Sequence, residues 1–348
     1  MPYPQKKYWP LIIASCLLAL LLVMLVSITL GPADISLTEA FRLILAKIPV
    51  VKEFMNTEQY PSTHQSIVYQ VRMPRIILAA LVGLALAAVG TTFQGLFKNP
   101  MADPYIIGVS SGAALGAAIA IVSGFSTTLG FGAIPLTAFG GALLAIFIVY
   151  NVARVGSRVP VYTLLLAGVA LSSFMSALTS LLMVLNAREL QQIIFWMLGS
   201  FAGKNWTQIA IVAPVIILGT GGLWLFARDL NAMLFGEETA RYLGIDAEKV
   251  KKLLLALAAV TIAAAVAVSG TIGFVGLIIP HLVRLFTGPD HRILLPAAAL
   301  IGAAFMVAAD TLARIAIAPA EIPVGIITAF FGGPFFIYLL RRKKAGGL

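Results

Sequence analysis

The sequence predicts an all-α polytopic membrane protein with about ten transmembrane helices. Of its 348 residues, 60% are hydrophobic and only 11% are charged, whereas soluble globular domains carry roughly 25% charged residues. The apolar residues run continuously and do not alternate with polar ones, so the spans are helices and not strands of an outer-membrane barrel. These observations exclude a soluble enzyme, a disordered tail and a fibrous repeat.

Ten apolar segments are bounded by Gly, Pro or charged residues and are predicted to be spans, and 272–286 is the shortest of them. About 20 helical residues cross a hydrocarbon core of about 30 Å. The predicted spans are 8–30, 74–97, 105–124, 130–153, 160–186, 206–228, 249–269, 272–286, 293–312 and 323–340. These spans use up the chain, so we expect residues 1–348 to form a single transmembrane domain.

The first apolar segment follows Lys6 and Lys7, as the core of a signal peptide would. It is too long for that role and no small-residue cleavage motif precedes Gly31, so we expect a retained span. The single cysteine, Cys16, lies within it. One cysteine forms no internal disulfide and no thiolate cluster for a metal, and no metal site is predicted.

The basic residues predict the orientation of the chain. With the N-terminus in the cytoplasm, 16 of the 24 Lys and Arg residues fall in inner segments and 8 in outer ones. This bias predicts that both termini are cytoplasmic. The net charge of +10 lies at span ends, so it is explained by topology and by contact with membrane lipid, and not by a nucleic-acid partner.

Two loops are longer than the others. In the outer loop, 31–71, Ser36 and Glu39 have the spacing of a capping box and predict a short helix. In the inner loop, 229–248, Glu237 and Glu238 open a short helix that Gly244 is placed to end. A stiff inner helix is suited to receive force from another protein, although a plain connecting hairpin explains the same residues.

Gly108, Gly112 and Gly116 recur every four residues in the third span. Such a face lets two helix backbones approach closely in a membrane. We expect close helix packing here, with a lining of a transport pathway as the alternative.

The chain lacks the motifs of an enzyme, and no catalytic residues are predicted. The three histidines, His64, His281 and His291, are far apart in sequence. Segment 199–205 (GSFAGKN) is one residue shorter than a phosphate-binding loop, and Asn replaces its hydroxyl residue. The chain is therefore not expected to hydrolyse ATP itself.

Ion-coupled transport requires titratable groups within the membrane. Asp310 is one candidate, and Glu321 lies at a span edge. Arg314 follows Asp310 by four residues, which favours a structural ion pair on one helix face over a proton relay. An ion-coupled secondary transporter that uses Asp310 remains the second hypothesis.

Several motifs occur in the order found in one known family. They are 71–75 (VRMPR), 97–112 (FKNPMADPYIIGVSSG), 164–170 (LLLAGVA), 196–200 (WMLGS), 236–244 (GEETARYLG), 270–281 (GTIGFVGLIIPH), 290–292 (DHR) and 309–310 (AD). From about residue 70 onward the chain resembles the FecCD-type permeases of type II ABC importers. This family serves iron–siderophores, haem and vitamin B12, and the chain resembles its vitamin B12 branch.

The resemblance implies ten spans and a permease dimer, expected to be a homodimer, with the substrate path along the two-fold axis. It also implies two cytoplasmic ATPase subunits that hold ATP and Mg, an outer substrate-binding protein, and no cofactor bound by this chain. The expected location is the cytoplasmic (inner) membrane of a bacterium or archaeon. Iron–siderophore or haem is the first expectation for the substrate, and a corrinoid is the alternative.

The resemblance also assigns site residues. His281 and Arg284 match the family and are expected to be structural. Val161 and Tyr162 replace the small hydroxyl residues of the vitamin B12 branch. The predicted sites are ATPase coupling at Gly236, Glu237, Ala240, Arg241, Leu243 and Gly244, a cytoplasmic gate at Asn99, Met101, Val161 and Tyr162, and binding-protein docking at Arg72, Arg75 and Arg314.

Overall fold

The computed structural model describes residues 4–46, 60–125, 132–156 and 159–345, and its elements are helices joined by loops. Part of the predicted outer loop, 47–59, and residues 157–158 of an inner loop lie outside the described residues.

All ten predicted spans are helical in the structure. Among the described residues, seven helices are long and apolar enough to cross a membrane. They are α1 (Trp9–Thr29), α5 (Met73–Leu96), α8 (Ala133–Ala153), α9 (Val161–Leu185), α11 (Trp206–Leu225), α14 (Ala247–Ser269) and α16 (His291–Ile315).

Three further helices have apolar stretches that are shorter than a full crossing. They are α6 (Val109–Val122), α15 (Val275–Thr287) and α17 (Val324–Ala345), the last of which is apolar as far as Tyr338. The chain turns before two of them begin: Gly108 has a φ of +86° ahead of α6, and Phe274 has a φ of +71° ahead of α15. The predicted spans 105–124 and 272–286 therefore start too early.

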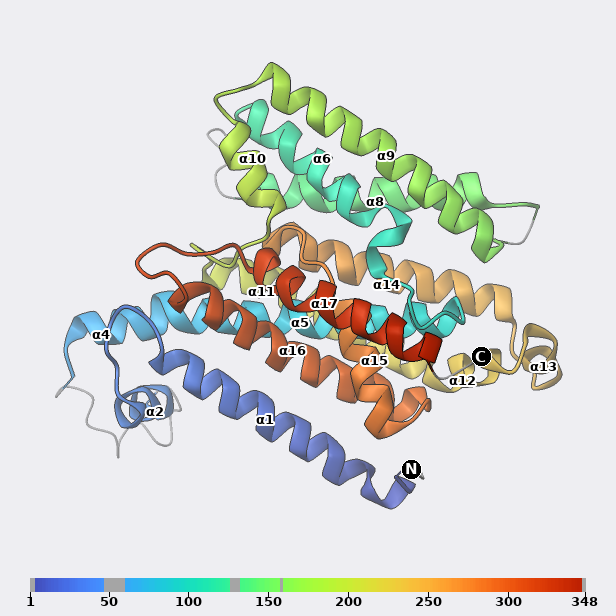
Figure 1. The fold of residues 1–348 in the computed structure, drawn as a ribbon, viewed down its shortest axis with the longest axis horizontal. Helices are drawn as coiled ribbons and strands as arrows, with labels where there is room; N and C mark the ends of the chain where they lie inside the picture. Colours follow the sequence, from blue (N-terminus) through green and yellow to red (C-terminus); the bar gives the residue numbers. More distant parts are fainter. Residues whose placement is uncertain (1–3, 47–59, 126–131, 157–158, 346–348) are drawn as a thin grey trace.

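Helix α5 lies at the centre of the molecule (Figure 1). It packs most extensively against α16 and also contacts α11, α14 and α15. Glycines allow these close approaches. A Cβ atom on Gly83 would lie 2.2 Å from the carbonyl oxygen of Gly302 on α16, and one on Gly90 would lie 1.9 Å from that of Gly276 on α15.

Two of the three glycines in the third span show the predicted close packing, against α8, whereas Gly108 precedes the helix and has only ordinary contacts. A Cβ atom on Gly112 would lie 2.4 Å from the carbonyl oxygen of Gly141, and one on Gly116 would lie 2.2 Å from that of Thr137. These backbones are in direct contact, so close packing, and not pathway lining, explains the two glycines.

The two ends of the molecule carry different elements. Figure 1 shows the N-terminus, the C-terminus, α12 (Ala227–Leu234) and α13 (Glu237–Tyr242) at one end, and α2 (Leu37–Leu45) and α4 (Ser62–Ser66) at the other. The described ends of the chain thus share a side, as the basic residues predict. We call the end with α13 the inner end and the opposite one the outer end.

Several helices were not predicted. The chain is helical from Ser62 through the π-helical stretch η2 (Ile67–Arg72) into α5, so the outer loop ends ten residues earlier than expected. Helix α10 (Leu190–Met197) and most of α12 lie where the sequence predicts connections between spans. In α2, the Ser36 side chain accepts from the backbone N–H of Glu39 at 3.2 Å. The Glu39 carboxylate, however, pairs with His64 at 2.8 Å and does not return to cap the helix.

Candidate functional site

The predicted inner helix exists as α13. Glycine residues in positive-φ conformations flank it, Gly236 at +119° and Gly244 at +82°. The Ile245 N–H donates to the carbonyl oxygen of Ala240 at 3.0 Å, which closes the C-terminus of the helix. The side chain of Asp246 then accepts from the Lys249 N–H at 3.1 Å and caps α14.

The predicted coupling residues divide between two faces of α13. Arg241 and Leu243 are exposed, whereas Ala240 is fully buried. Tyr242, which was not predicted, is 92% exposed and extends the outward face. A partner at the inner end would therefore contact Arg241, Tyr242 and Leu243, while Ala240 holds the helix against its own subunit.

An ion pair between Glu237 and Lys251 joins α13 to α14. The Lys251 ammonium group donates to Glu237 at 2.5 Å and to Glu248 at 3.3 Å. The hydrogen bond from Lys251 lowers the pKa of Glu237 below its ordinary value, although partial burial opposes this. Glu237, predicted for ATPase coupling, thus positions α13 as well.

A second set of hydrogen bonds joins α12 to the start of α16. The Asn231 amide donates to Asp290 at 2.8 Å and accepts from the backbone N–H of His291 at 2.9 Å. Hydrogen bonds from Arg292, reinforced by the Arg292 N–H and Asn231, lower the pKa of Asp290 to about 2. Sequence reasoning missed Asn231 because it lies on a helix that was not predicted. Helix α12 also contacts α13 and the central α5.

The four predicted gate residues lie on two separate elements near the inner end. Asn99 and Met101 follow α5, where the Asn99 side chain accepts from the Met101 N–H at 2.9 Å. Val161 and Tyr162 form the first turn of α9 after Pro160, and Tyr162 is exposed. Among the contacts of the described residues, no hydrogen bond joins one pair to the other.

A hollow of about 430 Å³ lies between α9 and the loops that precede α6 and α15. The hydroxyl of Tyr105 donates to the carbonyl oxygen of Ile272 at 2.9 Å and links these two loops. The Asp103 carboxylate accepts from the Tyr105 N–H at 2.8 Å, and burial raises its pKa. The hollow is lined by Asp103, Tyr105, Ile106, Val169, Ser172, Ser173, Gly273 and Phe274.

A stripe of hydroxyl groups continues from this hollow along α9. Ser173, Ser176 and Ser180 are exposed, and their spacing places them on one helix face. The hydroxyl of Ser173 donates to the carbonyl oxygen of Val169 at 3.0 Å, so it is satisfied within the helix. The same face carries the exposed side chains of Val169 and Val184, so it mixes hydroxyl and aliphatic groups and is more compatible with water than a fully aliphatic face.

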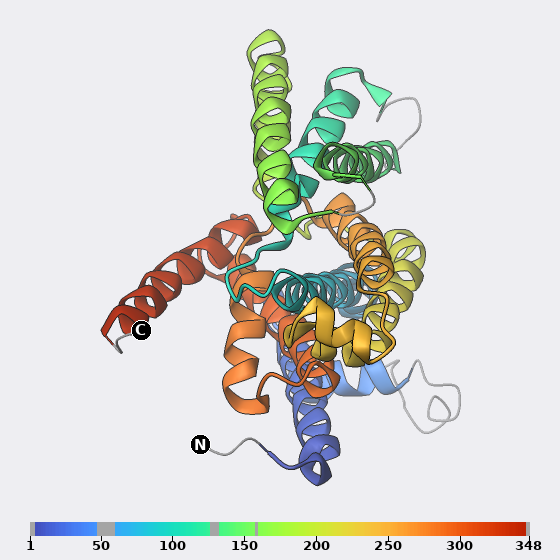
Figure 2. The same ribbon diagram turned by 90° about the vertical axis from the view of Figure 1, so that its right-hand side faces the viewer.

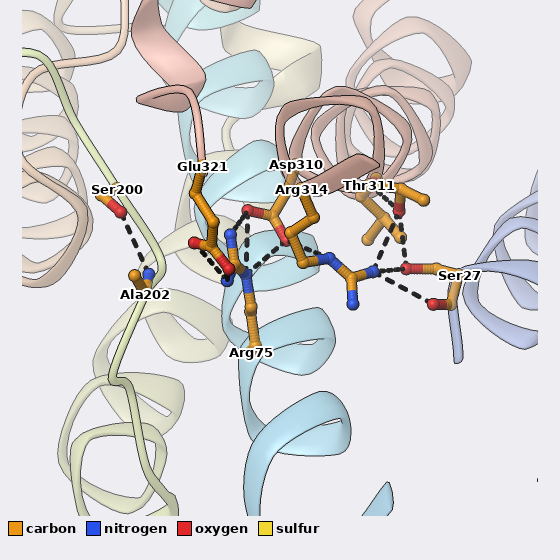
Figure 3. Close-up of polar contacts among 9 residues, drawn as sticks. Ser27, Arg75, Ser200, Ala202, Asp310, Thr311, Arg314 and Glu321 are labelled. Atoms are coloured by element: carbon orange, nitrogen blue, oxygen red, sulfur yellow. Dashed lines mark hydrogen bonds and ion pairs between the residues drawn. The ribbon is translucent and has the colours of Figure 1, made fainter. Parts of the chain in front are cut away.

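At the outer end, Arg75 forms the centre of a charged cluster (Figure 3). Its guanidinium group contacts Asp310 with Nη2 to Oδ1 and Nε to Oδ2 distances of 2.9 Å each. Its Nη1 atom contacts both carboxylate oxygens of Glu321 at 2.9 Å. Asp310 has no exposed surface, whereas the Glu321 side chain is 42% exposed.

Arg314 and Arg72 hold the end of α1. The Nη2 atom of Arg314 donates to the backbone oxygen of Ser27 at 3.0 Å and to its hydroxyl at 2.9 Å (Figure 3). Arg72 donates to the carbonyl oxygens of Ile28 at 2.5 Å and Ala33 at 2.7 Å. Cations at a helix C-terminus stabilise its free carbonyl groups.

The outer cluster departs from the sequence-based expectation in two ways. The three arginines predicted to face a docking partner are only 3% (Arg72), 6% (Arg75) and 5% (Arg314) exposed. The expected Asp310–Arg314 pair has a distance of 3.7 Å, so Arg75 is the main partner of Asp310. Arg75 is 235 residues from Asp310 in sequence, and helix periodicity does not reveal such a pair. Full burial and pairing of Asp310 favour a structural role over a proton relay.

Comparisons with known proteins agree with this architecture. The FecCD transport family model matches residues 18–342. A cobalamin import permease of Halobacterium salinarum is 50% identical over 288 residues, which cover 83% of this chain and 77% of the relative. A hemin transport permease of Yersinia pestis is 42% identical over 336 residues, which cover 94% and 96% of the two chains.

One solved structure is similar over nearly its whole length. It is described as an inward-facing conformation of a metal-chelate type ABC transporter, and its chain is 35% identical, with a TM-score of 0.80, covering 96% of this chain and 99% of its own. The chain therefore belongs to the FecCD transport family and is the multi-pass, non-catalytic permease subunit of a prokaryotic ABC importer of the metal-chelate, haem or vitamin B12 class.

Proposed function

We propose that two copies of this chain form a pathway along their two-fold axis and move a metal chelate inward by alternating access. Two cytoplasmic ATPase subunits drive the cycle, and an outer binding protein delivers the substrate. The observation that carries this proposal is the hydroxyl stripe on α9, which leads into the hollow at Asp103 and Tyr105. Figure 2 supports the proposal, because α9 and α17 lie away from the central α5 and leave faces free for a second copy.

The proposed coupling to ATP runs through α13. Its outward face, formed by Arg241, Tyr242 and Leu243, docks on the ATPase, and the Asn231–Asp290 contact passes the movement to α16. Rigid-body rocking of packed helices then opens one end of the pathway while it closes the other. Asn99, Met101, Val161 and Tyr162 close the inner end when the two copies come together.

The dimer can be tested with a single cysteine. In a Cys16→Ala background, Val161→Cys is expected to crosslink between two subunits and to block transport, while the matched control Leu218→Cys, on the far side at α11, should not crosslink. Absence of a Val161 crosslink in every nucleotide state would contradict an axial position for this gate.

Within the substrate class, we propose a metal tetrapyrrole, with a corrinoid ahead of haem. This order reverses the expectation from sequence, where iron–siderophore or haem came first. The greater identity to the cobalamin permease, 50% against 42% for the hemin permease, supports the change. In this proposal the binding protein selects among such ligands.

Uptake into vesicles tests the substrate. The permease, reconstituted with its ATPase and binding protein, should accumulate labelled cobalamin only with hydrolysable ATP. Uptake of haem or a ferric siderophore in preference to cobalamin would overturn the corrinoid assignment. Uptake driven by a proton gradient without ATP would overturn the importer mechanism.

The outer arginines are buried and paired, so they can dock a binding protein only if one of their contacts is exchanged. We propose that an acidic residue of the binding protein displaces Glu321 from Arg75, because Glu321 is the exposed partner. A guanidinium group offers a bidentate fork to either carboxylate. Glu321→Gln should then raise the association rate of the binding protein in a salt-dependent manner. An association rate unchanged by this substitution and by salt would refute docking at Arg75.

A further inference from the structure

We propose that a pocket between α8, α11 and α14, in the outer half of the molecule, binds an acyl chain of an outer-leaflet phospholipid. The pocket has a volume of about 650 Å³. The lining includes Leu136 on α8, Ile211 and Val215 on α11, and Ala264 and Ala267 on α14.

The pocket arises from small side chains on α14. Ala264 and Ala267 form its floor and are 3% and 4% exposed. Helices α8 and α11 both pack against α14, and a larger side chain at either alanine would occupy the space between them. At the mouth, Leu136 on α8 and Ile211 on α11 are 69% and 66% exposed, so the pocket opens on the outside of the helix bundle.

The opening faces lipid. Figure 2 shows α8 and α11 on either side of α14, on the opposite side of the molecule from α17. Because these are membrane-spanning helices of a multi-pass permease, an opening on this face meets hydrocarbon. The opening stays in contact with lipid when the second copy binds at α9 and α17, so this inference rests on the proposed dimer and not on the identity of the substrate.

An empty apolar pocket beside hydrocarbon loses dispersion contacts along its walls. Water gains little in the rest of the pocket, because it needs polar partners and the polar lining residues, Asn205, Thr207 and Gln208, all lie at the outer end. A lipid tail is as apolar as Leu and restores these contacts. We therefore infer an acyl chain as the occupant.

The polar lining residues mark the outer end of the pocket. Asn205, Thr207 and Gln208 all lie at the outer start of α11, where interfacial polar groups are expected. The Gln208 N–H donates to the Asn205 side chain, and the Asn205 N–H donates to the Gln208 side chain. These amides already cap α11, so we expect the pocket to select an acyl chain and to show little preference among head groups.

Photo-crosslinking tests the site directly. The full-length permease in nanodiscs is irradiated with a phosphatidylcholine that carries a diazirine in the middle of one acyl chain, and the labelled peptides are identified by mass spectrometry. Labelling of the buried pocket floor on α14 is expected, because a chain that stays outside the bundle cannot reach Ala264 or Ala267.

A matched pair of variants on α11 provides the control. Val215→Trp fills the pocket and should abolish labelling of the α14 floor, whereas Leu218→Trp adds a similar volume to the lipid-exposed face and should preserve it. Ala267→Leu fills the pocket more gently and should also abolish the label, so the test survives poor folding of one variant.

Two kinds of result would contradict the proposal. An unlabelled α14 floor in the natural protein, or unchanged labelling in both Val215→Trp and Ala267→Leu, would overturn the proposal. Labelling that is strong with phosphatidylglycerol and absent with phosphatidylcholine would overturn the acyl-chain selectivity and indicate a head-group site.

Discussion

Two charged clusters at opposite ends of the molecule differ in how deeply they are buried and in how far apart their residues lie in the sequence. At the outer end, Arg75 and Asp310 are almost completely buried and join α5 to α16. At the inner end, Lys251 is also buried, but its partner Glu237 has a side chain that is 43% exposed. The paired residues of the outer cluster are 235 positions apart in the sequence, and those of the inner cluster are only 14 positions apart.

This difference indicates that the two clusters have different roles. A buried ion pair has lost its hydration, so removal of one partner leaves an uncompensated charge and disrupts the structure. A half-exposed pair exchanges its partner for water or another protein at small cost. We infer that the outer cluster keeps α1, α5 and α16 together, while the inner cluster can adjust as a partner docks on α13.

The largest expected effect is at Asp310. Asp310→Ala leaves Arg75 and Arg314 without their buried carboxylate and should lower the free energy of unfolding by roughly 3–5 kcal/mol. Glu321→Ala, which removes the exposed partner of the same arginine, should cost about 1 kcal/mol or less. Thermal unfolding in detergent measures both. Equal losses for the two variants would show that burial of the carboxylate does not determine how much its pair with Arg75 stabilises the protein.

The second-largest effect on stability is expected for a substitution of Asn231. Asn231→Ala removes the partner of Asp290 and of the His291 N–H and should cost about 1–3 kcal/mol. Substrate-stimulated ATP hydrolysis should fall more than binding of the ATPase, because the α12–α16 connection is lost. Asn186→Ala is the control, since the Asn186 amide donates only to the Leu182 carbonyl oxygen of its own helix at 2.9 Å. Undiminished stimulation in Asn231→Ala would argue against this route for coupling.

A smaller effect is expected at Lys251. Lys251→Met should lower the free energy of unfolding by about 1 kcal/mol and weaken ATPase binding, because α13 is less firmly held. Lys252→Met removes an exposed neighbour of the same charge and should change stability by less than about 0.5 kcal/mol. ATPase affinity that responds equally to both substitutions would point to general charge attraction and not to positioning of α13.

The smallest effect is the response of the inner pair to pH. The pKa of Glu237 is lowered in the folded state, so its pair with Lys251 contributes full stability above the unfolded-state pKa. That contribution is lost as the pH falls through the lowered folded-state value. The difference in Tm between the natural protein and Lys251→Met should therefore shrink in acid. A difference independent of pH would show that packing of Lys251, and not its charge, stabilises α13.

Local patterns in the sequence determined much of this protein. Long apolar runs produce membrane helices wherever they occur, because unpaired backbone groups are intolerable in lipid. Caps and glycines act on their immediate neighbours, which is why Ser36, Gly244 and the face at Gly112 and Gly116 were predicted correctly. Ordered motifs also revealed the family.

Only the tertiary structure decided which distant side chains meet. Arg75 was predicted to face outward, yet the packing of α5 against α16 buries it on Asp310. Asn231 had no recognisable motif, and its partner Asp290 is 59 residues away. The lipid pocket likewise depends on the separation of three helices. Hydrophobic runs predict that helices form, but the contacts between their faces depend on how the whole bundle packs.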